Sequence, residues 1–235
     1  MALLGLLLGG CQVAFGIKTV SDDGPGVDAA GLPGVVAHYT FDEVASGPCL
    51  PDDSGGAHAG TCFGDPVTLV AGKVGQAFSF AGKTGIQIPS TGEIAGPGPF
   101  TFAGWFENTS VPTDGMCPFN RLLGNSGDNP WQVCLYTYGV DFYFSGAPTL
   151  SGSAVTQDAW HHFAITSTGT DVRAYVDFAQ VGAESAVLTF DDQPLVFGAD
   201  IDPKGVNNPI TGALDEVWIF DRALSVPELL TLEAP

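Results

Sequence analysis

Residues 160–176, WHHFAITSTGTDVRAYV, hold the pattern that decides the fold. In the segment VRAYV, positions 172, 174 and 176 are apolar and alternate with Arg173 and Tyr175, as a half-buried strand requires. A second β-rich run, His161–Ser167, precedes it. The link Thr168–Asp171 contains a glycine and is typical of a hairpin turn. This stretch therefore predicts two antiparallel strands.

The same pattern continues along the chain from residue 35, where β-rich runs alternate with turn signals about every 8–12 residues. This spacing favours an all-β sandwich or barrel over a parallel α/β sheet. Phe100–Phe106 is apolar on both faces and predicts a central strand. The other expected strands are Val36–Thr40, Ala77–Phe80, Gly85–Ile88, Trp131–Tyr136, Val140–Phe144, Val172–Asp177, Ala186–Phe190, Leu195–Phe197 and Gly212–Phe220.

One short helix is expected near the C-terminus. Ser225 and Glu228 have the spacing of a capping box, and Pro227 would lie in the first turn, where its missing N–H costs little. The chain has 235 residues, of which 45% are apolar and 14% charged, so one globular domain is expected and disorder or a coiled coil is excluded.

The charge balance excludes polyanion partners. The chain has 26 acidic and 7 basic residues and a formal net charge of −19, which opposes binding to nucleic acid or to anionic lipid headgroups. An excess of carboxylates gives either a solvated surface or oxygen ligands for a hard cation such as Ca²⁺.

The N-terminus predicts export. Residues 1–10 form an apolar run too short to span a bilayer and typical of a signal peptide. Leu8–Cys11 resembles the bacterial lipobox, which implies acylation of Cys11, and Gln12 after it implies the outer membrane. Residues 11–34 would then be the lipidated cysteine and a flexible tether, with the folded domain at 35–235. The alternatives are a plain secretory signal or a buried N-terminal strand.

Four further cysteines predict two disulfides, because an exported chain folds under oxidising conditions. Three pairings are possible. We favour Cys49 with Cys62 and Cys117 with Cys134, because each pair flanks a loop rich in Gly, Pro and Asp. A zinc site is the alternative, but the spacing of a zinc-binding motif is absent.

Seven segments carry a family resemblance, and in order they are Val36–Glu43, Asp53–Gly60, Gly72–Phe80, Phe100–Trp105, Trp160–Ala164, Val172–Asp177 and Gly212–Leu224. Together they resemble the bacterial laminin G-like family of the concanavalin A-like lectin/glucanase superfamily. This resemblance implies a jelly-roll sandwich of two antiparallel sheets, one convex and one concave. The usual Val-Asp-Gly turn of the family is Val-Asp-Phe here, ending at Phe178.

A calcium site is expected from Asp42 and Asp215. They lie in the segments 36–43 and 212–220, which hold the first and last strands and which the resemblance implies are neighbours. Ca²⁺ takes carboxylate and carbonyl oxygens as ligands. The alternative is that both aspartates cap strand ends or accept hydrogen bonds from backbone N–H groups. Glu43, Asp53 and Glu216 are weaker candidates.

Catalysis is not expected. The Glu-x-Asp-x-x-Glu string of the related β-glucanases is absent, and a regular strand would send the adjacent Asp215 and Glu216 to opposite faces. The neighbouring His161 and His162 would likewise diverge, which favours a packing role for both.

Binding is therefore the expected function. Carbohydrate modules present aromatic faces to sugar rings, and Trp131 and Tyr138, which flank loops, are the candidate ligand-binding residues. Asn129, Gln132, Tyr136 and Tyr143 supply further aromatic and hydrogen-bonding groups. We expect a monomer that binds a cell-surface glycan. A protein-binding adhesion or structural module is the alternative, and a glycoside hydrolase is a remote third.

Overall fold

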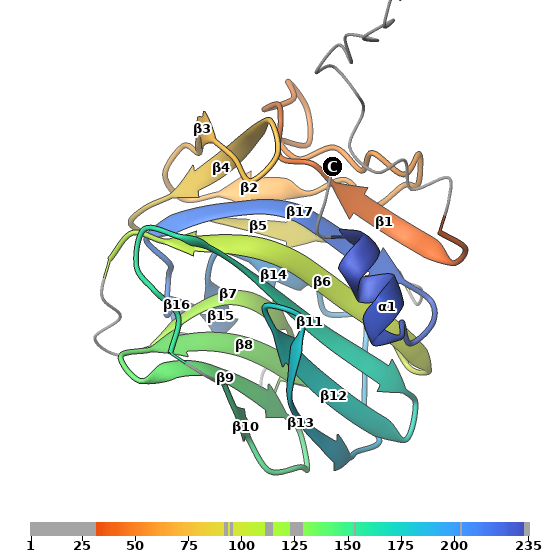
Figure 1. The fold of residues 1–235 in the computed structure, drawn as a ribbon. Coiled ribbons are helices and arrows are strands. Elements are labelled where there is room, and N and C mark those ends of the chain that lie inside the picture. Colours follow the sequence, from red (N-terminus) through yellow and green to blue (C-terminus); the bar gives the residue numbers. More distant parts are fainter. Residues whose placement is uncertain are drawn as a thin grey trace, which may run out of the picture.

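The computed structural model describes residues 32–91, 94, 96–110, 115–122, 129–152, 154–202 and 204–232, and two β-sheets dominate its fold (Figure 1). Every pairing between the described strands is antiparallel, as the sequence predicts. The predicted signal segment, Cys11 and residues 12–31 lie outside the described residues.

The first sheet has eight strands. β1 pairs with β17 beside the main path of this sheet. In spatial order the strands of that path are β13 (Ala179–Ser185), β12 (Asp171–Val176), β11 (Trp160–Thr168), β6 (Pro99–Asn108), β17 (Gly212–Phe220), β4 (Gln76–Phe80) and β3 (Thr68–Ala71), and β1 spans Val35–Tyr39.

The second sheet has seven strands, and a two-stranded ribbon lies beside it. In spatial order the strands are β10 (Leu150–Ser151), β9 (Gly139–Phe144), β8 (Trp131–Tyr136), β7 (Met116–Arg121), β14 (Leu195–Phe197), β5 (Gly85–Ile88) and β2 (Thr61–Phe63). The ribbon consists of β15 (Asp200–Asp202) and β16 (Gly205–Asn207).

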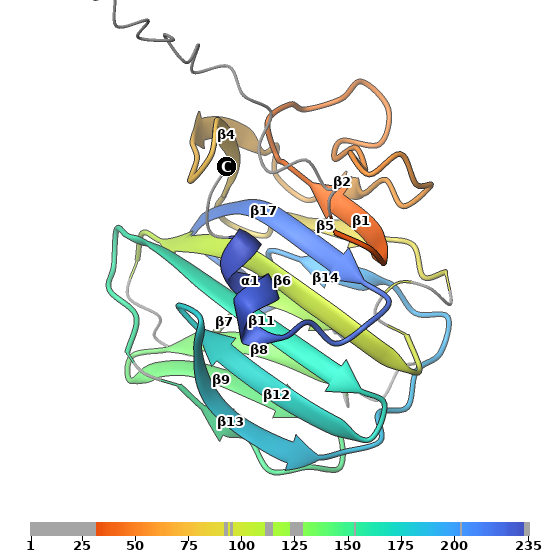
Figure 2. The same ribbon diagram turned by 45° about the vertical axis from the view of Figure 1, so that its right-hand side comes forward.

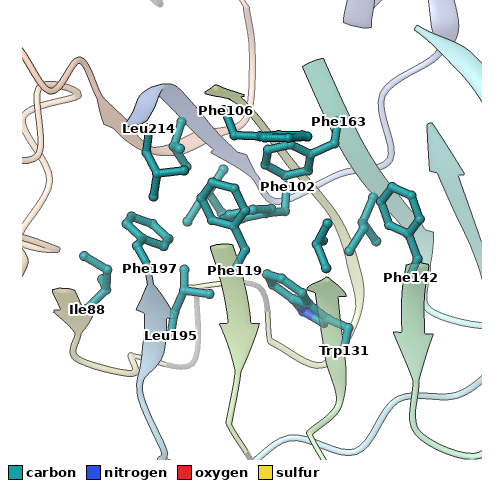
Figure 3. Close-up of a cluster of buried hydrophobic side chains, with 14 of the residues drawn as sticks. Ile88, Phe102, Phe106, Phe119, Trp131, Phe142, Phe163, Leu195, Phe197 and Leu214 are labelled. Carbon is teal, nitrogen blue, oxygen red and sulfur yellow. The ribbon is translucent and has the colours of Figure 1, made fainter. Parts of the chain in front are cut away.

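The core fills the space between the two sheets and is rich in phenylalanine (Figure 3). Phe119 of the second sheet packs against Phe163 and Phe102 of the first, with ring centroids 4.4 and 5.1 Å away. Burying one such side chain contributes roughly 1.5–3 kcal/mol. Face-to-face packing of two antiparallel sheets over one core confirms the predicted sandwich.

The predicted helix is present and covers the outer face of the eight-stranded sheet (Figure 2). α1 spans Val226–Leu229 and continues as a 3₁₀ turn, Leu230–Leu232. The backbone N–H of Ser225 donates to the Glu228 carboxylate at 2.8 Å, which confirms the capping box. Leu229 and Leu232 are buried in a small apolar cluster on this face.

One predicted strand is wrong. Residues 186–190 are not a strand; instead, β13 begins directly after the turn Asp177–Phe178 and ends at Ser185. Both turn residues have positive φ, +47° and +64°, as a two-residue hairpin turn requires. The tight turn lets β13 pair with β12 at once, so the chain leaves the sheet before residue 186.

Two disulfides have the predicted pairing, Cys49–Cys62 and Cys117–Cys134. Their Cα atoms lie 5.7 and 4.0 Å apart. Disulfides form and persist in oxidising compartments, so they indicate an extracellular location. Among the helices of the described segments, none is long and apolar enough to cross a membrane.

Candidate functional site

The outer face of the seven-stranded sheet presents polar and aromatic side chains. Along β8, Trp131, Val133 and Leu135 point into the core, so Gln132, Cys134 and Tyr136 point outward. Along β9, residues 140, 142 and 144 belong to the core, so Asp141 and Tyr143 share the outer face with β8. The register places Asp141 opposite Cys134 and Tyr143 opposite Gln132.

Three tyrosines and one aspartate form a connected group on this face, which we call the tyrosine cluster: Tyr136, Tyr138, Asp141 and Tyr143. The rings of Tyr136 and Tyr138 stack with centroids 5.2 Å apart and an interplanar angle of 2°. Tyr138 lies in the β8–β9 turn and is 59% exposed. It is the only aromatic among the exposed large hydrophobic side chains of the described residues.

Asp141 anchors the tyrosine cluster. Its Oδ2 accepts hydrogen bonds from the hydroxyls of Tyr138 at 2.7 Å and Tyr143 at 3.2 Å. The Tyr143 hydroxyl also lies 3.0 Å from that of Tyr136. The hydrogen bond to Asp141 raises the pKa of Tyr138 to about 12, so this phenol stays neutral and keeps its proton at physiological pH.

Further polar groups extend this face toward the β15–β16 ribbon. The Asn129 amide donates to Asp200 Oδ1 at 3.1 Å, and Gln132 also bonds to this carboxyl. Burial raises the pKa of Asp200. The Cys117–Cys134 disulfide joins β7 to β8 across the face. The backbone N–H of Cys117 donates a hydrogen bond to the backbone carbonyl of Asn208 at 2.8 Å.

The prediction that Trp131 is an exposed ligand-binding residue is wrong. Its side chain is 0% exposed and packs 4.8 Å from Phe102 and 6.5 Å from Phe100, measured between ring centroids (Figure 3). The reason is strand alternation, since Trp131 shares its face with Val133 and Leu135. The exposed ring of Tyr138 agrees with its predicted position beside a loop.

Asp42 and Asp215 lie on either side of the turn Gly72–Gly75 between β3 and β4. Asp215 Oδ2 accepts the backbone N–H of Val74 at 2.9 Å, and Asp42 Oδ1 accepts that of Gln76 at 2.7 Å. The structure therefore shows the hydrogen bonds of the alternative interpretation. Burial, followed by the neighbouring charges of Glu216 and Asp42, raises the pKa of Asp215 to about 8.

Several oxygen atoms converge at this turn, and this arrangement is relevant to the binding of a cation. A Cβ atom on Gly72 would lie 2.5–2.6 Å from the carbonyl oxygens of Val74 and Gln76 and from Asp215 Oδ2. The position therefore requires glycine. Two carboxylates and two carbonyls are ligand types that Ca²⁺ accepts. In the described part of the chain, no group of three or more His, Cys, Asp or Glu side chains is arranged around a metal.

The adjacent carboxylates Asp215 and Glu216 do not diverge as expected. β17 bulges at Glu216, whose φ is +47°, and its pairing with β6 shifts register there. Leu214 and Val217 both face the core, so the two acidic side chains between them leave on the outer face. Glu216 pairs with His38 at 2.8 Å, and His38 stacks on Trp218.

The two adjacent histidines have separate structural roles, as their divergence predicts. His162 is buried and stacks on Phe178 at 4.1 Å. His161 bonds Asp177 through Nδ1 at 2.9 Å, and its Nε2 accepts the backbone N–H of Thr156 at 3.0 Å. Both ring nitrogens of His161 are thus engaged in holding loops together.

A cavity of about 710 Å³ lies away from the tyrosine cluster, between the start of β1 and the loop before β6. Glycine, proline and apolar residues dominate its lining, and the one Phe, Tyr or Trp among the lining residues that the structure describes, Phe100, is buried. His58 in this lining contacts Thr91 through Nδ1 at 3.3 Å. An exposed ring to stack on a sugar is therefore found at Tyr138 and not here.

The fold defines the class of this chain, a sandwich of two antiparallel β-sheets. The chain belongs to the concanavalin A-like lectin/glucanases superfamily, whose laminin G-type family model matches residues 80–230. A search of curated proteins finds no match.

Solved structures share this fold at low sequence identity. Domain 4 of an extracellular arabinanase from Geobacillus stearothermophilus, in complex with arabinotriose, is 20% identical with a TM-score of 0.63, covering 85% of this chain and 98% of that one. Trypanosoma rangeli sialidase in complex with sialic acid is 16% identical with a TM-score of 0.69, covering 85% and 32%. The binding domain of botulinum neurotoxin DC, in complex with SialylT, is 13% identical with a TM-score of 0.63, covering 86% and 51%.

The chain thus spans about a third of the sialidase and half of the toxin domain, but nearly all of the arabinanase domain. These likenesses show the fold alone. Their ligands bear on this chain only as a guide to its function.

Proposed function

We propose that this chain is an exported, non-catalytic module that binds carbohydrate at the tyrosine cluster. The observation that carries the proposal is the stacked pair of Tyr136 and Tyr138, whose outer ring is 59% exposed. A sugar ring presents an apolar C–H face that packs on an aromatic face. The three structural neighbours described above, solved with sugar-type ligands, support this class of ligand.

The polar groups around the rings suit a sugar's hydroxyls. A tyrosine hydroxyl can donate and accept hydrogen bonds, and a carboxylate such as that of Asp141, which already binds Tyr138 and Tyr143, can accept them. Because Asp141 holds two of these hydroxyls in place, the Tyr138 ring is pre-oriented before a ligand arrives. Such pre-organisation lowers the entropic cost of binding.

A glycan array probed with the oxidised protein tests this function. We expect defined oligosaccharides to bind. Tyr138→Ala should lower their affinity about tenfold or more, as the loss of a central aromatic contact does. Val187→Ala, which trims an exposed side chain away from this face, should leave binding unchanged. If no glycan binds and a cell-surface protein is retained instead, the adhesion alternative replaces the proposal.

We also propose a structural Ca²⁺ held by Asp42 and Asp215 with the carbonyls of Val74 and Gln76. Its support is the buried carboxyl of Asp215, which forms no ion pair with a described residue and converges with the carbonyl oxygens of Val74 and Gln76 near Gly72. At 100 times Kd, Ca²⁺ would add about 2.7 kcal/mol to the stability. For a domain of this size the unfolding midpoint would rise by roughly 5–11 °C relative to EDTA. An unchanged midpoint would leave both aspartates as acceptors of backbone hydrogen bonds.

Anchoring through an acylated Cys11 is a third proposal. The Leu8–Cys11 motif and the two disulfides support an exported lipoprotein. Cys11→Ala should release the protein from membranes, measured by fractionation and immunoblot. Continued membrane association of this variant would contradict the anchor.

A further inference from the structure

The charge distribution around the tyrosine cluster bears on which sugars it accepts. Asp141 lies at the centre of the cluster and is 4% exposed. Its Oδ2 is bonded only by neutral tyrosine hydroxyls, and its Oδ1 has no hydrogen-bond partner. Within the described residues no ion pair involves Asp141. Its negative charge is therefore not cancelled by a nearby cation.

The neighbouring ribbon adds more negative charge. Asp200 and Asp202 flank Ile201 on β15, and Asp200 is joined to β8 through Gln132. Lys204 follows in the ribbon turn, where its backbone N–H donates to Asp202 at 2.6 Å. Three carboxylates and one exposed lysine thus surround this part of the face.

The other described cations lie elsewhere. Arg121 is buried, and its guanidinium donates to the carbonyls of Leu122, Gln193 and Asp191. Lys83 is in the β4–β5 turn, at the β5 and β2 edge of the sheet, whereas β8 and β9 lie near the opposite edge. The remaining cations, Lys73, Arg173 and Arg222, belong to the eight-stranded sheet or its connections.

Acidic sugars carry a carboxylate that proteins bind best with arginine, whose planar fork matches its two oxygens. On the described outer face of the seven-stranded sheet, no arginine is available for this role. Two like charges repel, and they repel more strongly near a protein surface than in bulk water, because the effective dielectric constant there is lower. Near the tyrosine cluster an acidic sugar therefore meets three carboxylates, with Lys204 as the single neighbouring cation among the described residues.

We propose that the tyrosine cluster selects uncharged glycans and discriminates against glycans that carry sialic or uronic acid. This inference rests on the proposed function and adds a substrate class to it. It separates this chain from the sialidase and the toxin domain, which were solved with sialic acid and SialylT.

Matched pairs of glycans test the selectivity. Each neutral oligosaccharide is compared with the same oligosaccharide capped by sialic acid, and Kd is measured by calorimetry on the full oxidised protein. The capped form should bind about tenfold more weakly. Raising the salt concentration from 50 to 500 mM should reduce the ratio between the two Kd values, because screening weakens the repulsion between the carboxylates.

Two variants locate the source of the selectivity. Asp141→Asn should reduce the ratio between the two Kd values, because it removes the charge and keeps the shape. Asp192→Asn makes the same change on the exposed loop before β14, near the Arg121 end of the sheet, and should leave the ratio unchanged. The salt dependence of the unaltered protein tests the same point if Asp141→Asn fails to fold.

The outcomes separate this inference from the proposed function. Equal or tighter binding of the capped form would overturn the selectivity and leave glycan binding intact. Binding to neither form would overturn the proposed function, and with it the selectivity. A gap that Asp192→Asn closes as fully as Asp141→Asn would overturn the role of Asp141.

Discussion

Tyr138 and Trp131 lie at the two ends of the same strand region and meet opposite environments. Trp131 fills the space between the sheets, whereas Tyr138 projects from the β8–β9 turn and stacks on Tyr136. The difference follows from the position of each residue in the alternation of β8 and in its turn. Trp131 therefore contributes stability, and Tyr138 is available for recognition.

This contrast predicts opposite effects of truncation. Trp131→Ala should lower the free energy of unfolding by about 3–5 kcal/mol, because it leaves a large cavity in the core. Tyr138→Ala should lower it far less than Trp131→Ala does, because the ring of Tyr138 is mostly in water. Urea unfolding measures both. Equal losses in the two variants would contradict the assignment of roles.

Asp215 predicts a pH dependence in EDTA. Its carboxyl holds a proton up to a pKa of about 8 in the folded protein, whereas the unfolded chain releases it near 4. Between these values the folded state binds more protons, so its stability should fall as the pH rises from 5 to 8. Asp215→Asn cannot titrate and should show a smaller decline in thermal unfolding over this range. A decline as steep as that of the unaltered protein would contradict the assigned pKa.

At the scale of elements, the C-terminal helix depends on Glu228. This carboxylate accepts the Ser225 N–H and hydroxyl and pairs with Arg222 at 2.6 Å. Glu228→Ala should cost about 1 kcal/mol, the typical effect of losing a cap, and lower the midpoint by about 2–4 °C. Glu184→Ala on the edge strand β13 is the matched control. A midpoint equal to that of this control would mean that the cap contributes nothing.

The two disulfides, Cys49–Cys62 and Cys117–Cys134, are a second source of stability at this scale. They close loops of 13 and 17 residues, each worth about 3 kcal/mol on the loop-entropy scale. A reductant should therefore lower the unfolding midpoint by roughly 6–12 °C for each bond. Replacing Cys117 and Cys134 together by Ala shows how much of this stabilisation comes from the disulfide beside the tyrosine cluster. An unchanged midpoint after verified reduction would contradict this stabilising role.

The sequence predicts best those strands whose large apolar residues alternate. β12 and β9 follow this pattern, and both lie where expected. β13, AQVGAES, consists of small and polar residues because it is a half-exposed edge strand, so the pattern lacks a signal there. Residues 186–190 are more apolar, and for this reason the prediction placed a strand there and not at β13.

The candidate site was only partly predictable for a related reason. The exposed Tyr138 could be inferred from its position beside a loop. The role of Asp141 could not, because its contact with Tyr143 and Tyr138 depends on the β8–β9 turn and on which faces are buried. The bulge at Glu216 likewise appears only when Leu214 and Val217 are both known to face the core.

At the scale of the whole molecule, the two sheets have different outer faces. The eight-stranded sheet is covered in part by α1 (Figure 2). Its β3–β4 turn is bonded by Asp42 and Asp215. The seven-stranded sheet carries the tyrosine cluster. This division assigns stability, with the proposed Ca²⁺, to one outer face and recognition to the other.

Hydrogen–deuterium exchange locates the binding face. The oxidised protein is measured alone and saturated with the tightest neutral oligosaccharide from the array. We expect new protection in residues 129–144, which include β8, its turn and β9, with little change in β11–β13. Protection confined to the eight-stranded sheet, with residues 129–144 unchanged, would contradict a sugar site at the tyrosine cluster.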